Sequence, residues 1–283
     1  MSGTLLEPLA PDRLTWVAPF GVQFCDAVTL APIRIGLEVI LKLADQPQLQ
    51  IQAHANSSGI LMAHRLPGMA ARIAGSGDAE FWRHPPASRD YLVEVRDRMG
   101  RYLPLRFHAR LPQRGLCLPE SLRGSPPASQ AIPLYSTPSR PRPLPLATVR
   151  GELRDAANNR PAAWAVVEIW YHGRPLGRGV ADAQGRVLLM FSWPEPEARG
   201  GASPPSPPGS LPLFSWQVQL RVYSSSQLPA ELAPDCDLLL NQRWAVPLAQ
   251  LSPPQPLAAL TLEYGRESLL RSGGADCLYL QRG

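Results

Sequence analysis

The sequence predicts an all-β protein that consists of two tandem β-sandwiches joined by a proline-rich linker. Three observations predict this class. Apolar and polar residues alternate with a period of two in several short segments, as is typical of half-buried strands. Proline, at 33 residues, outnumbers glycine, at 22, and proline disfavours long helices because it lacks an N–H and clashes with the preceding turn. Several landmarks also recur in the same order in the two halves of the chain.

The expected organisation divides the 283 residues into four parts. Residues 1–13 are expected to form an N-terminal arm, and residues 14–118 the first sandwich. The dense prolines of residues 119–146 predict a stiff, extended linker, with an SH3-type ligand as the alternative interpretation of their PxxP spacing. Residues 147–283 form the second sandwich, which carries a flexible low-complexity insertion at residues 198–209.

In the first half, the clearest strand is residues 37–43, where every second residue is apolar and one face is therefore expected to be buried. Residues 91–96 alternate in the same way. Residues 68–90 show little pattern and are interpreted as a long loop, which in a compact domain is usually functional or disordered. The other strands expected in this half are residues 14–24, 48–54, 60–66 and 101–111.

In the second half, residues 216–222 alternate most regularly. Residues 164–171 are apolar at both parities, which predicts a central strand buried on both faces. The turn at 182–185 is expected to close a hairpin whose second arm begins at Val187. Further strands are expected at residues 147–153, 187–193, 244–246, 258–264 and 277–280.

Seven residues are expected to shape turns rather than to carry chemistry. An aspartate at the first position of a turn accepts hydrogen bonds from backbone N–H groups, and a turn glycine supplies a positive φ. Calcium binding is the alternative for the aspartates, but each of them stands alone in its own turn. The seven residues are Asp26, Gly59, Asp97, Gly100, Asp155, Asp182 and Gly185.

An internal repeat becomes visible when Asp26 is aligned with Asp155. In both copies Asp-Ala is followed by a proline six residues after the aspartate, then by an apolar strand and a turn glycine. The segments that begin YLVEVR at Tyr91 and WQVQLR at Trp216 then match. Because a few short strands cannot bury one face alone, the repeat predicts two sandwiches with the same strand plan.

Three segments of the second half resemble the carboxypeptidase-regulatory-like, or transthyretin-like, family of Ig-type sandwiches. They are residues 151–155, with the Gly-x-Leu-x-Asp opening, residues 161–167, and the Asp-x-x-Gly-x-Val turn at 182–187. The upstream copy departs from this pattern, because Asn56 stands where the turn aspartate is expected. The resemblance implies a fold more than an activity, since such sandwiches serve as spacers, adhesins and scaffold modules.

A second resemblance concerns residues 91–104 and residues 162–165 with Glu168. These segments are similar to two-domain proteins of phage-tail-like contractile injection systems. The resemblance implies a non-enzymatic structural part of the baseplate or periphery of such a particle, which is assembled in the cytoplasm. Its expected partners are the other protein subunits of the assembly.

Composition argues against several other classes. The net charge of +5 comes almost entirely from arginine. However, Arg96, Arg98 and Arg101 lie beside Glu94 and Asp97, so these arginines form no continuous basic stripe. Nucleic-acid binding is therefore not predicted. No apolar run reaches the ~20 residues of a membrane helix, so no membrane insertion is expected. The N-terminus lacks the pattern of a secretory signal, which predicts a cytoplasmic protein with reduced thiols.

No catalytic, cofactor or metal motif stands out, so we expect neither an enzyme nor a cofactor. The four cysteines are far apart and form no CxxC pair, and no serine lies in a Gly-x-Ser-x-Gly elbow. His54 and His64 flank the hairpin at Gly59 and could approach each other, but the sequence offers them no third ligand.

Aromatic residues outside the strand pattern are the candidate interface: Phe81 and Trp82, and Trp244 beside Arg243. They either fold back to cover a sandwich or anchor a protein interface, where Trp, Tyr and Arg are enriched. The leading hypothesis is thus a structural component of a large assembly. The alternatives are a carbohydrate- or surface-binding adhesin module with exposed tryptophans, and an accessory domain of a hydrolase with an acidic or nucleophilic cluster in a cleft.

Overall fold

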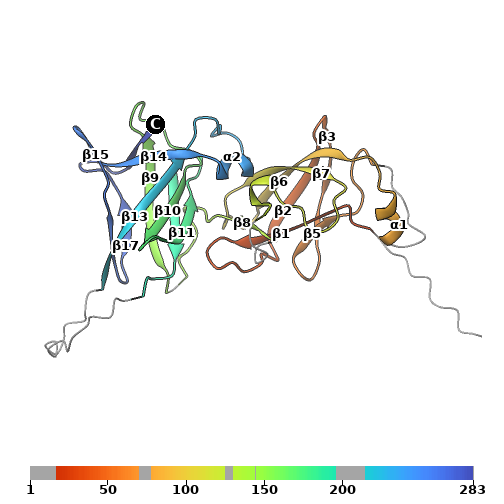
Figure 1. Cartoon of the computed structure of the whole chain (residues 1–283), viewed down its shortest axis with the longest axis horizontal. Helices are drawn as coiled ribbons and strands as arrows, with labels where there is room; N and C mark the ends of the chain where they lie inside the picture. The colour runs from red at the N-terminus through yellow and green to blue at the C-terminus, as the bar shows by residue number, and fades with distance from the viewer. Residues whose placement is uncertain (1–16, 70–77, 125–129, 144, 196–213, 283) are drawn as a thin grey trace, which may run out of the picture.

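The computed structural model describes residues 17–69, 78–124, 130–143, 145–195 and 214–282. Strands dominate these residues, and their two α-helices are short: α1 (Asp78–Arg83) and α2 (Cys236–Leu240). The predicted all-β class is therefore confirmed. Figure 1 shows two strand-rich halves that lie one after the other along the long axis. The predicted arm and the predicted insertion fall outside the described residues.

One sheet of the first half has the strand order β4-β5-β1-β8. Strand β1 is antiparallel to β5 and parallel to β8, which closes this sheet. Phe20, Val22 and Phe24 of β1 are fully buried, as expected for alternate residues on the core side of a strand. The strands are β1 (Phe20–Asp26), β4 (His54–Ala55), β5 (Ile60–Ala63) and β8 (Ile132–Leu134).

The other sheet of the first half is antiparallel, with the order β3-β2-β6-β7. It follows the predicted period: Val39, Leu41 and Leu43 are buried, whereas Lys42 forms an ion pair with Glu94 at 2.9 Å on the other face. Both sheets contribute apolar side chains to one core. The strands are β2 (Leu37–Leu43), β3 (Gln46–Gln52), β6 (Arg89–Asp97) and β7 (Leu105–Leu111).

The strands of the second half form one continuous ladder, β11-β10-β13-β14-β18-β9-β12. Its long strands change neighbours along their length: β9 begins between β12 and β17 and ends beside β18. The strands are β9 (Ala147–Asp155), β10 (Val166–Tyr171), β11 (Arg174–Val180), β12 (Arg186–Phe191), β13 (Ser215–Ser224), β14 (Arg243–Leu251), β15 (Pro254–Pro256), β16 (Leu260–Glu263), β17 (Glu267–Leu270) and β18 (Leu278–Arg282).

The two halves repeat one strand plan. The order β3-β2-β6-β7 corresponds to β11-β10-β13-β14, and the order β5-β1-β8 corresponds to β12-β9-β18. The halves differ at one edge, because β14 is hydrogen-bonded to β18 and thereby joins two sheets that stay separate in the first half. This correspondence supports the interpretation of each half as a sandwich, and that interpretation stays a prediction.

The turn predicted at residues 182–185 is present, but the prediction that the strands on either side of it form a hairpin is wrong. The turn forms, with the Gly185 N–H donating to the Asp182 carbonyl at 3.0 Å, but β12 pairs with β9 and not with β11. Strand β11 instead packs against β12, which its glycines permit. A Cβ atom at Gly177 would lie only 2.8 Å from Cβ of Phe191. The turn therefore connects two layers.

The expected linker at residues 119–146 also contains secondary structure. A 3₁₀ turn spans Glu120–Leu122, and β8 joins the first half with Ile132 and Leu134 buried in its core. Proline is tolerated in β8 because this strand lies at the edge of its sheet. Likewise, α1 forms within residues 68–90, where a loop was predicted.

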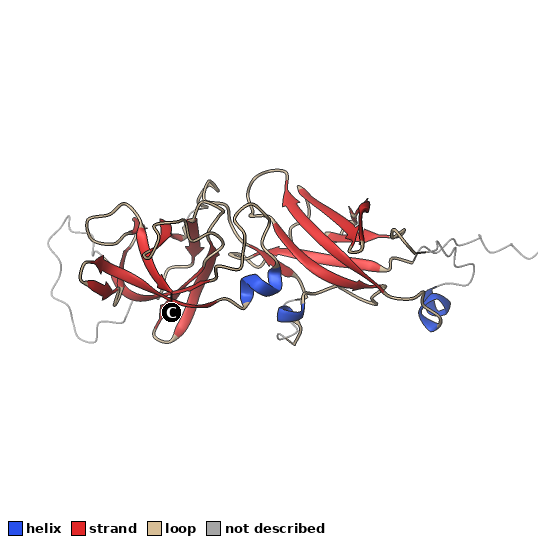
Figure 2. Cartoon of the chain, turned by 90° about the horizontal axis from the view of Figure 1, so that it is seen from above, coloured by secondary structure: helices blue, strands red, loops and turns tan. Residues whose placement is uncertain are grey.

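The two halves share a core at their junction. The core of the first half continues into Trp164, Val180 and Leu239 of the second half. Backbone contacts add to this packing, since the Arg106 N–H donates to the Pro234 carbonyl at 3.0 Å. Figure 2 shows short helical segments at this junction, between the strands of the two halves.

Candidate functional site

Asp26 and Asp155 lie at equivalent positions of two similar loops. In each, Oδ1 accepts a hydrogen bond from the N–H two residues later, at 2.8 Å in the first copy and 2.9 Å in the second. The residue four positions after the aspartate has a positive φ, 58° at Leu30 and 57° at Asn159. Both carboxylates are buried, so they serve the backbone of their loops rather than an external ligand.

Three other turns use the same chemistry. The Oδ1 atom of Asp182 accepts hydrogen bonds from the N–H groups two and four residues later, both at 2.9 Å. Asn56 accepts the equivalent two bonds at 3.0 and 2.9 Å, since its carbonyl oxygen lies where a carboxylate oxygen would lie. Asp97 uses both of its oxygens, at 3.2 and 2.7 Å. The glycines of these turns all have positive φ: Gly59 at 79°, Gly100 at 66° and Gly185 at 78°.

Metal and thiol chemistry find little support in the described ranges. No group of three or more His, Cys, Asp or Glu side chains there could hold a metal ion. All four cysteines are free and buried. Burial raises the pKa of Cys117 to about 11 and that of Cys236 to about 12, so both thiols stay protonated and unreactive at neutral pH.

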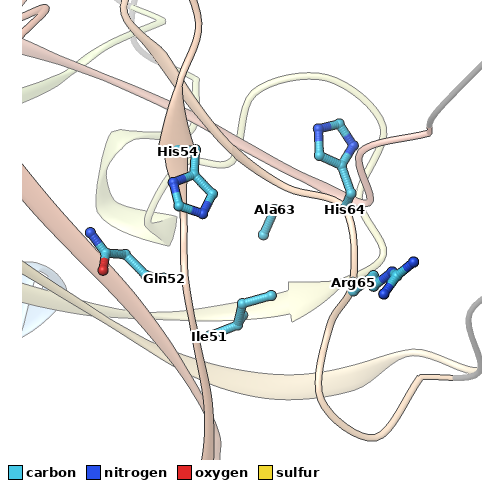
Figure 3. Close-up of a pocket in the computed structure, with 6 residues that line it drawn as sticks. All are labelled: Ile51, Gln52, His54, Ala63, His64 and Arg65. Atoms are coloured by element: carbon cyan, nitrogen blue, oxygen red, sulfur yellow. The ribbon is translucent and has the colours of Figure 1, made fainter.

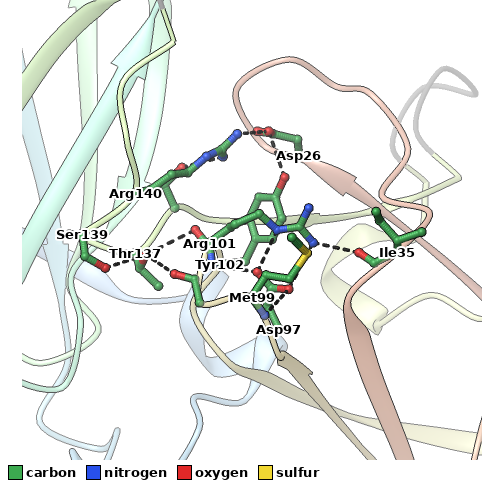
Figure 4. A network of polar contacts seen from close by, with 11 residues as sticks. Asp26, Ile35, Asp97, Met99, Arg101, Tyr102, Thr137, Ser139 and Arg140 are labelled. Carbon is green, nitrogen blue, oxygen red and sulfur yellow. Dashed lines mark hydrogen bonds and ion pairs between the residues drawn. The ribbon is translucent and has the colours of Figure 1, made fainter.

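A polar network surrounds Asp26 in the first half (Figure 4). The Oδ2 atom of Asp26 accepts hydrogen bonds from the Tyr102 hydroxyl at 3.0 Å and from Arg140 at 2.5 Å. The guanidinium groups of Arg101 and Arg140 lie 5.1 and 4.9 Å from the centroid of the Tyr102 ring. Burial alone would raise the pKa of Asp26, but the bonds from Arg140, the Val28 N–H and Tyr102 hold it below its usual value.

This network predicts an acid-dependent loss of stability. A carboxylate with a lowered pKa in the folded state stabilises the protein above its unfolded pKa of about 4, and this stabilisation is lost as the pH falls further. We expect Asp26→Asn to lower the free energy of unfolding at pH 7 by about 1.5–3 kcal/mol, the range for hydrogen bonds to a charged group. The difference from the wild type should narrow between about pH 5 and pH 2.

Urea unfolding across this pH range measures the effect, with Asp276→Asn at an exposed position as the matched control. A difference between wild type and Asp26→Asn that stayed constant from pH 7 to pH 2 would contradict the assignment of the stabilisation to the charged carboxylate.

The structure does not bring the two predicted interface pairs together. Phe81 and Trp82 lie in α1, half-buried, with their ring centroids 5.0 Å apart. Arg243 and Trp244 begin β14, in the other half (Figure 1). Trp244 is 48% exposed and makes an edge contact with Tyr223 at 5.9 Å. Trp244 is therefore the better candidate for contact with a partner.

A chain of side chains on β10, β11 and β13 also contacts the first half. The Arg221 guanidinium lies 3.8 Å from the Trp170 ring centroid, and the Trp170 Nε1–H donates to Glu168 at 2.8 Å. Glu168 also accepts a hydrogen bond from Arg178 at 2.8 Å, and Arg178 interacts electrostatically with Tyr135 of the first half. Burial raises the pKa of Tyr135, so its hydroxyl stays protonated. This set reinforces the junction.

The two predicted histidines lie at one shallow groove of the first half (Figure 3). The groove has a volume of about 470 Å³. His54 pairs with Met62 across β4 and β5, which places His54 and His64 on the same face of the sheet. Figure 3 shows their rings on opposite sides of Ala63, not in contact with each other. Both histidines therefore line the same groove, but they are not arranged to bind one metal ion together.

An aromatic pocket in the second half was missed by the sequence reasoning. Trp193, Phe214, Trp216 and Tyr264 line it, with a volume of about 600 Å³. Trp216 was expected to face the core, and it does lie there, with 5% exposure. The signal that could have revealed the pocket is that aromatic residues flank the proline-rich insertion on both sides.

No helix in the described part of the chain has the length and apolar character needed to cross a membrane. Comparison with known proteins finds no matching family, no similar curated protein and no similar solved structure.

Proposed function

We propose that this chain is a non-enzymatic structural component of a larger protein assembly. One observation carries the proposal: the core of the first half continues into the second half through Trp164, Val180 and Leu239. Two domains that move independently share a smaller and more polar interface. A shared core instead holds the surfaces of the two halves at a fixed spacing, which is useful for positioning neighbouring subunits.

Exposed side chains suited to protein contacts are present on this body. Trp244 and Arg243 are exposed at the start of β14, and Trp and Arg are enriched among the residues that dominate binding energy at interfaces. Partners are thus other protein subunits, and the assembly forms in the cytoplasm.

A phage-tail-like contractile injection particle is the assembly that we propose to test first, with this chain in its baseplate or periphery. The sequence resemblance behind this choice covers residues 91–104 and residues 162–165 with Glu168. Residues 91–104 lie in β6 and in the turn that follows it. Tyr91, Val93 and Val95 are buried there. The resembling residues are therefore part of the scaffold, and the contacts with neighbours would come from other surfaces.

The test is to tag the chain in its native host, purify large particles by density gradient, and quantify the tagged chain in each fraction. We expect it to migrate with the particles at a fixed ratio to their subunits. The double substitution Arg243→Glu and Trp244→Glu should shift most of the chain to the light fractions. Leu269→Glu, at a residue with 48% exposure on β17, is the matched control. A wild-type chain found only in the light fractions would overturn the proposal.

A further inference from the structure

The aromatic pocket of the second half lies where β13 begins. Four aromatic side chains surround it, and the ring centroid of Trp193 lies 5.6 Å from that of Trp216 and 5.1 Å from that of Tyr264. Phe214 is stacked on Trp216 with an angle of 22° between the ring planes. Pro145, Leu146 and Pro194 extend the same apolar lining. The pocket is within the size range of natural ligand sites.

Folding alone does not account for this cluster. Phe214 is 41% exposed and Tyr264 is 55% exposed, although burying an aromatic side chain is among the most favourable contributions that a residue can make. Contiguous exposed apolar surface of this kind commonly marks a site of interaction.

Three hydrogen-bond donors lie among these rings, and one of them is satisfied within the chain. The Trp216 Nε1–H is satisfied within the chain, since it donates to the Glu195 carbonyl at 3.4 Å. Within the described residues, no acceptor takes a hydrogen bond from the Trp193 Nε1–H or from the Tyr264 hydroxyl. A ligand of this pocket would therefore be apolar over most of its surface and would offer acceptors to these two donors.

We propose that the pocket binds a proline-rich segment of a partner protein, in the polyproline II conformation and with a basic residue beside the prolines. Polyproline II has no internal hydrogen bonds, so its carbonyl groups are free to accept from Trp193 and Tyr264. Its pyrrolidine rings pack between aromatic side chains in the grooves that recognise such segments.

The charge of the pocket specifies the basic residue. Glu195 is exposed and is the only charged residue among the described residues that line the pocket, so it would attract an arginine or lysine of the ligand. A glycan is the less favoured ligand, because sugar hydroxyls need several polar partners and Glu195, Ser192 and the two ring donors offer few. Pro145 and Pro194 already belong to the lining, so proline rings form part of this apolar surface.

This inference deepens the proposed function, in that it names the chemistry of one partner segment. The experiment uses the full chain and a fluorescein-labelled peptide of sequence STPSRPRPLP, which this chain contains at residues 136–145 and which combines prolines with arginines. We expect saturable binding by fluorescence anisotropy, and no binding of a peptide in which alanine replaces every proline.

Variants then locate the site. We expect Tyr264→Phe, which keeps the ring and removes the donor, to weaken binding about threefold or more, as for the loss of one hydrogen bond. Trp193→Ala should weaken it at least about tenfold, as for a central interface residue. Glu195→Gln should reduce both the affinity and its dependence on salt. Met99→Ala, at a residue of the first half that is 59% exposed and does not line the pocket, should leave binding unchanged.

Three outcomes would overturn the inference: no binding of the proline peptide at millimolar concentration, equal binding of the alanine peptide, or binding that none of the three pocket variants weakens. Displacement of the peptide by cello- or chito-oligosaccharides would identify a glycan site instead. Migration of the wild-type chain with particles does not depend on this titration, so failure of the peptide result and failure of the proposed function can be told apart.

Discussion

Replacing Gly185 with alanine is expected to lower the free energy of unfolding by about 3 kcal/mol. Gly185 has a φ of 78°, which disfavours any residue with a Cβ atom. A Cβ atom there would also lie 2.4 Å from the carbonyl oxygen of Leu153. That oxygen accepts a hydrogen bond from the Ala162 N–H at 2.9 Å, so the substitution would disturb the contact between the turn at residues 182–185 and the segments that flank the Asp155 loop.

The matched control is Gly100→Ala in the first half. Gly100 has a similar φ of 66°, but no atom lies within 4 Å of the position that its Cβ would take. This variant should therefore show only the backbone cost, about 1 kcal/mol. Urea unfolding followed by circular dichroism compares the two. Equal losses at both glycines would show that the close approach of Leu153 does not constrain the turn.

Trp164→Ala is expected to destabilise the protein by about 3–5 kcal/mol, the usual range for removing a buried tryptophan. Trp164 is 4% exposed and belongs to the core that crosses the junction. Its Nε1–H donates to the Pro229 carbonyl at 3.0 Å. Because the side chain lies between the halves, its loss should also uncouple their unfolding, so that one cooperative transition separates into two.

Differential scanning calorimetry measures both effects, because it reports the midpoint and the number of transitions. Trp244→Ala is the control, since this tryptophan is 48% exposed and its truncation should leave one transition. If Trp164→Ala lowers the midpoint but preserves a single transition, the two halves are not coupled through this side chain.

Strands with one solvent-exposed face and one buried face were largely predictable from the sequence. Residues 216–222 alternate strictly and residues 37–43 alternate except at Ile40. Each segment forms most or all of a strand, with its apolar face largely buried. The repeat was predictable for a related reason. Asp26 and Asp155 each need the same short loop, with a positive φ four residues later and a proline two residues beyond, and such local requirements are visible as spacing.

What the sequence could not provide was the pairing between distant strands. The sequence around Ile132 does not indicate a strand, because three residues with a central proline resemble a linker. Their place is set by β1 and by the core around Phe24. In the same way, residues 182–185 have the spacing of a tight turn whether the strands on either side pair with each other or with other strands. Only the glycines of β11 indicate that β11 packs face to face on β12.

The candidate surfaces were predictable to a smaller extent. An exposed tryptophan and a buried one look alike in a sequence, so Trp82 and Trp244 could be proposed but not ranked. The aromatic pocket escaped because Trp193 and Tyr264 are 71 positions apart and meet only through the arrangement of β12, β13 and β16. Surfaces are built from the ends of strands, and their composition depends on topology more than on local pattern.

The parallel strand that closes each half has a consequence for the order of folding. β1 acquires its parallel neighbour β8, and β9 its parallel neighbour β18, only after about a hundred intervening residues. Pairs so distant form slowly, because a long loop must close before their contacts can form. Each half is therefore expected to fold in two stages. In the early stage, neighbouring antiparallel strands such as β6 and β7 pair. Until the late stage, β1 and β9 each keep an unpaired edge, which is covered only when β8 or β18 docks. Those two edges are where a newly made chain is most exposed to pairing with the wrong partner.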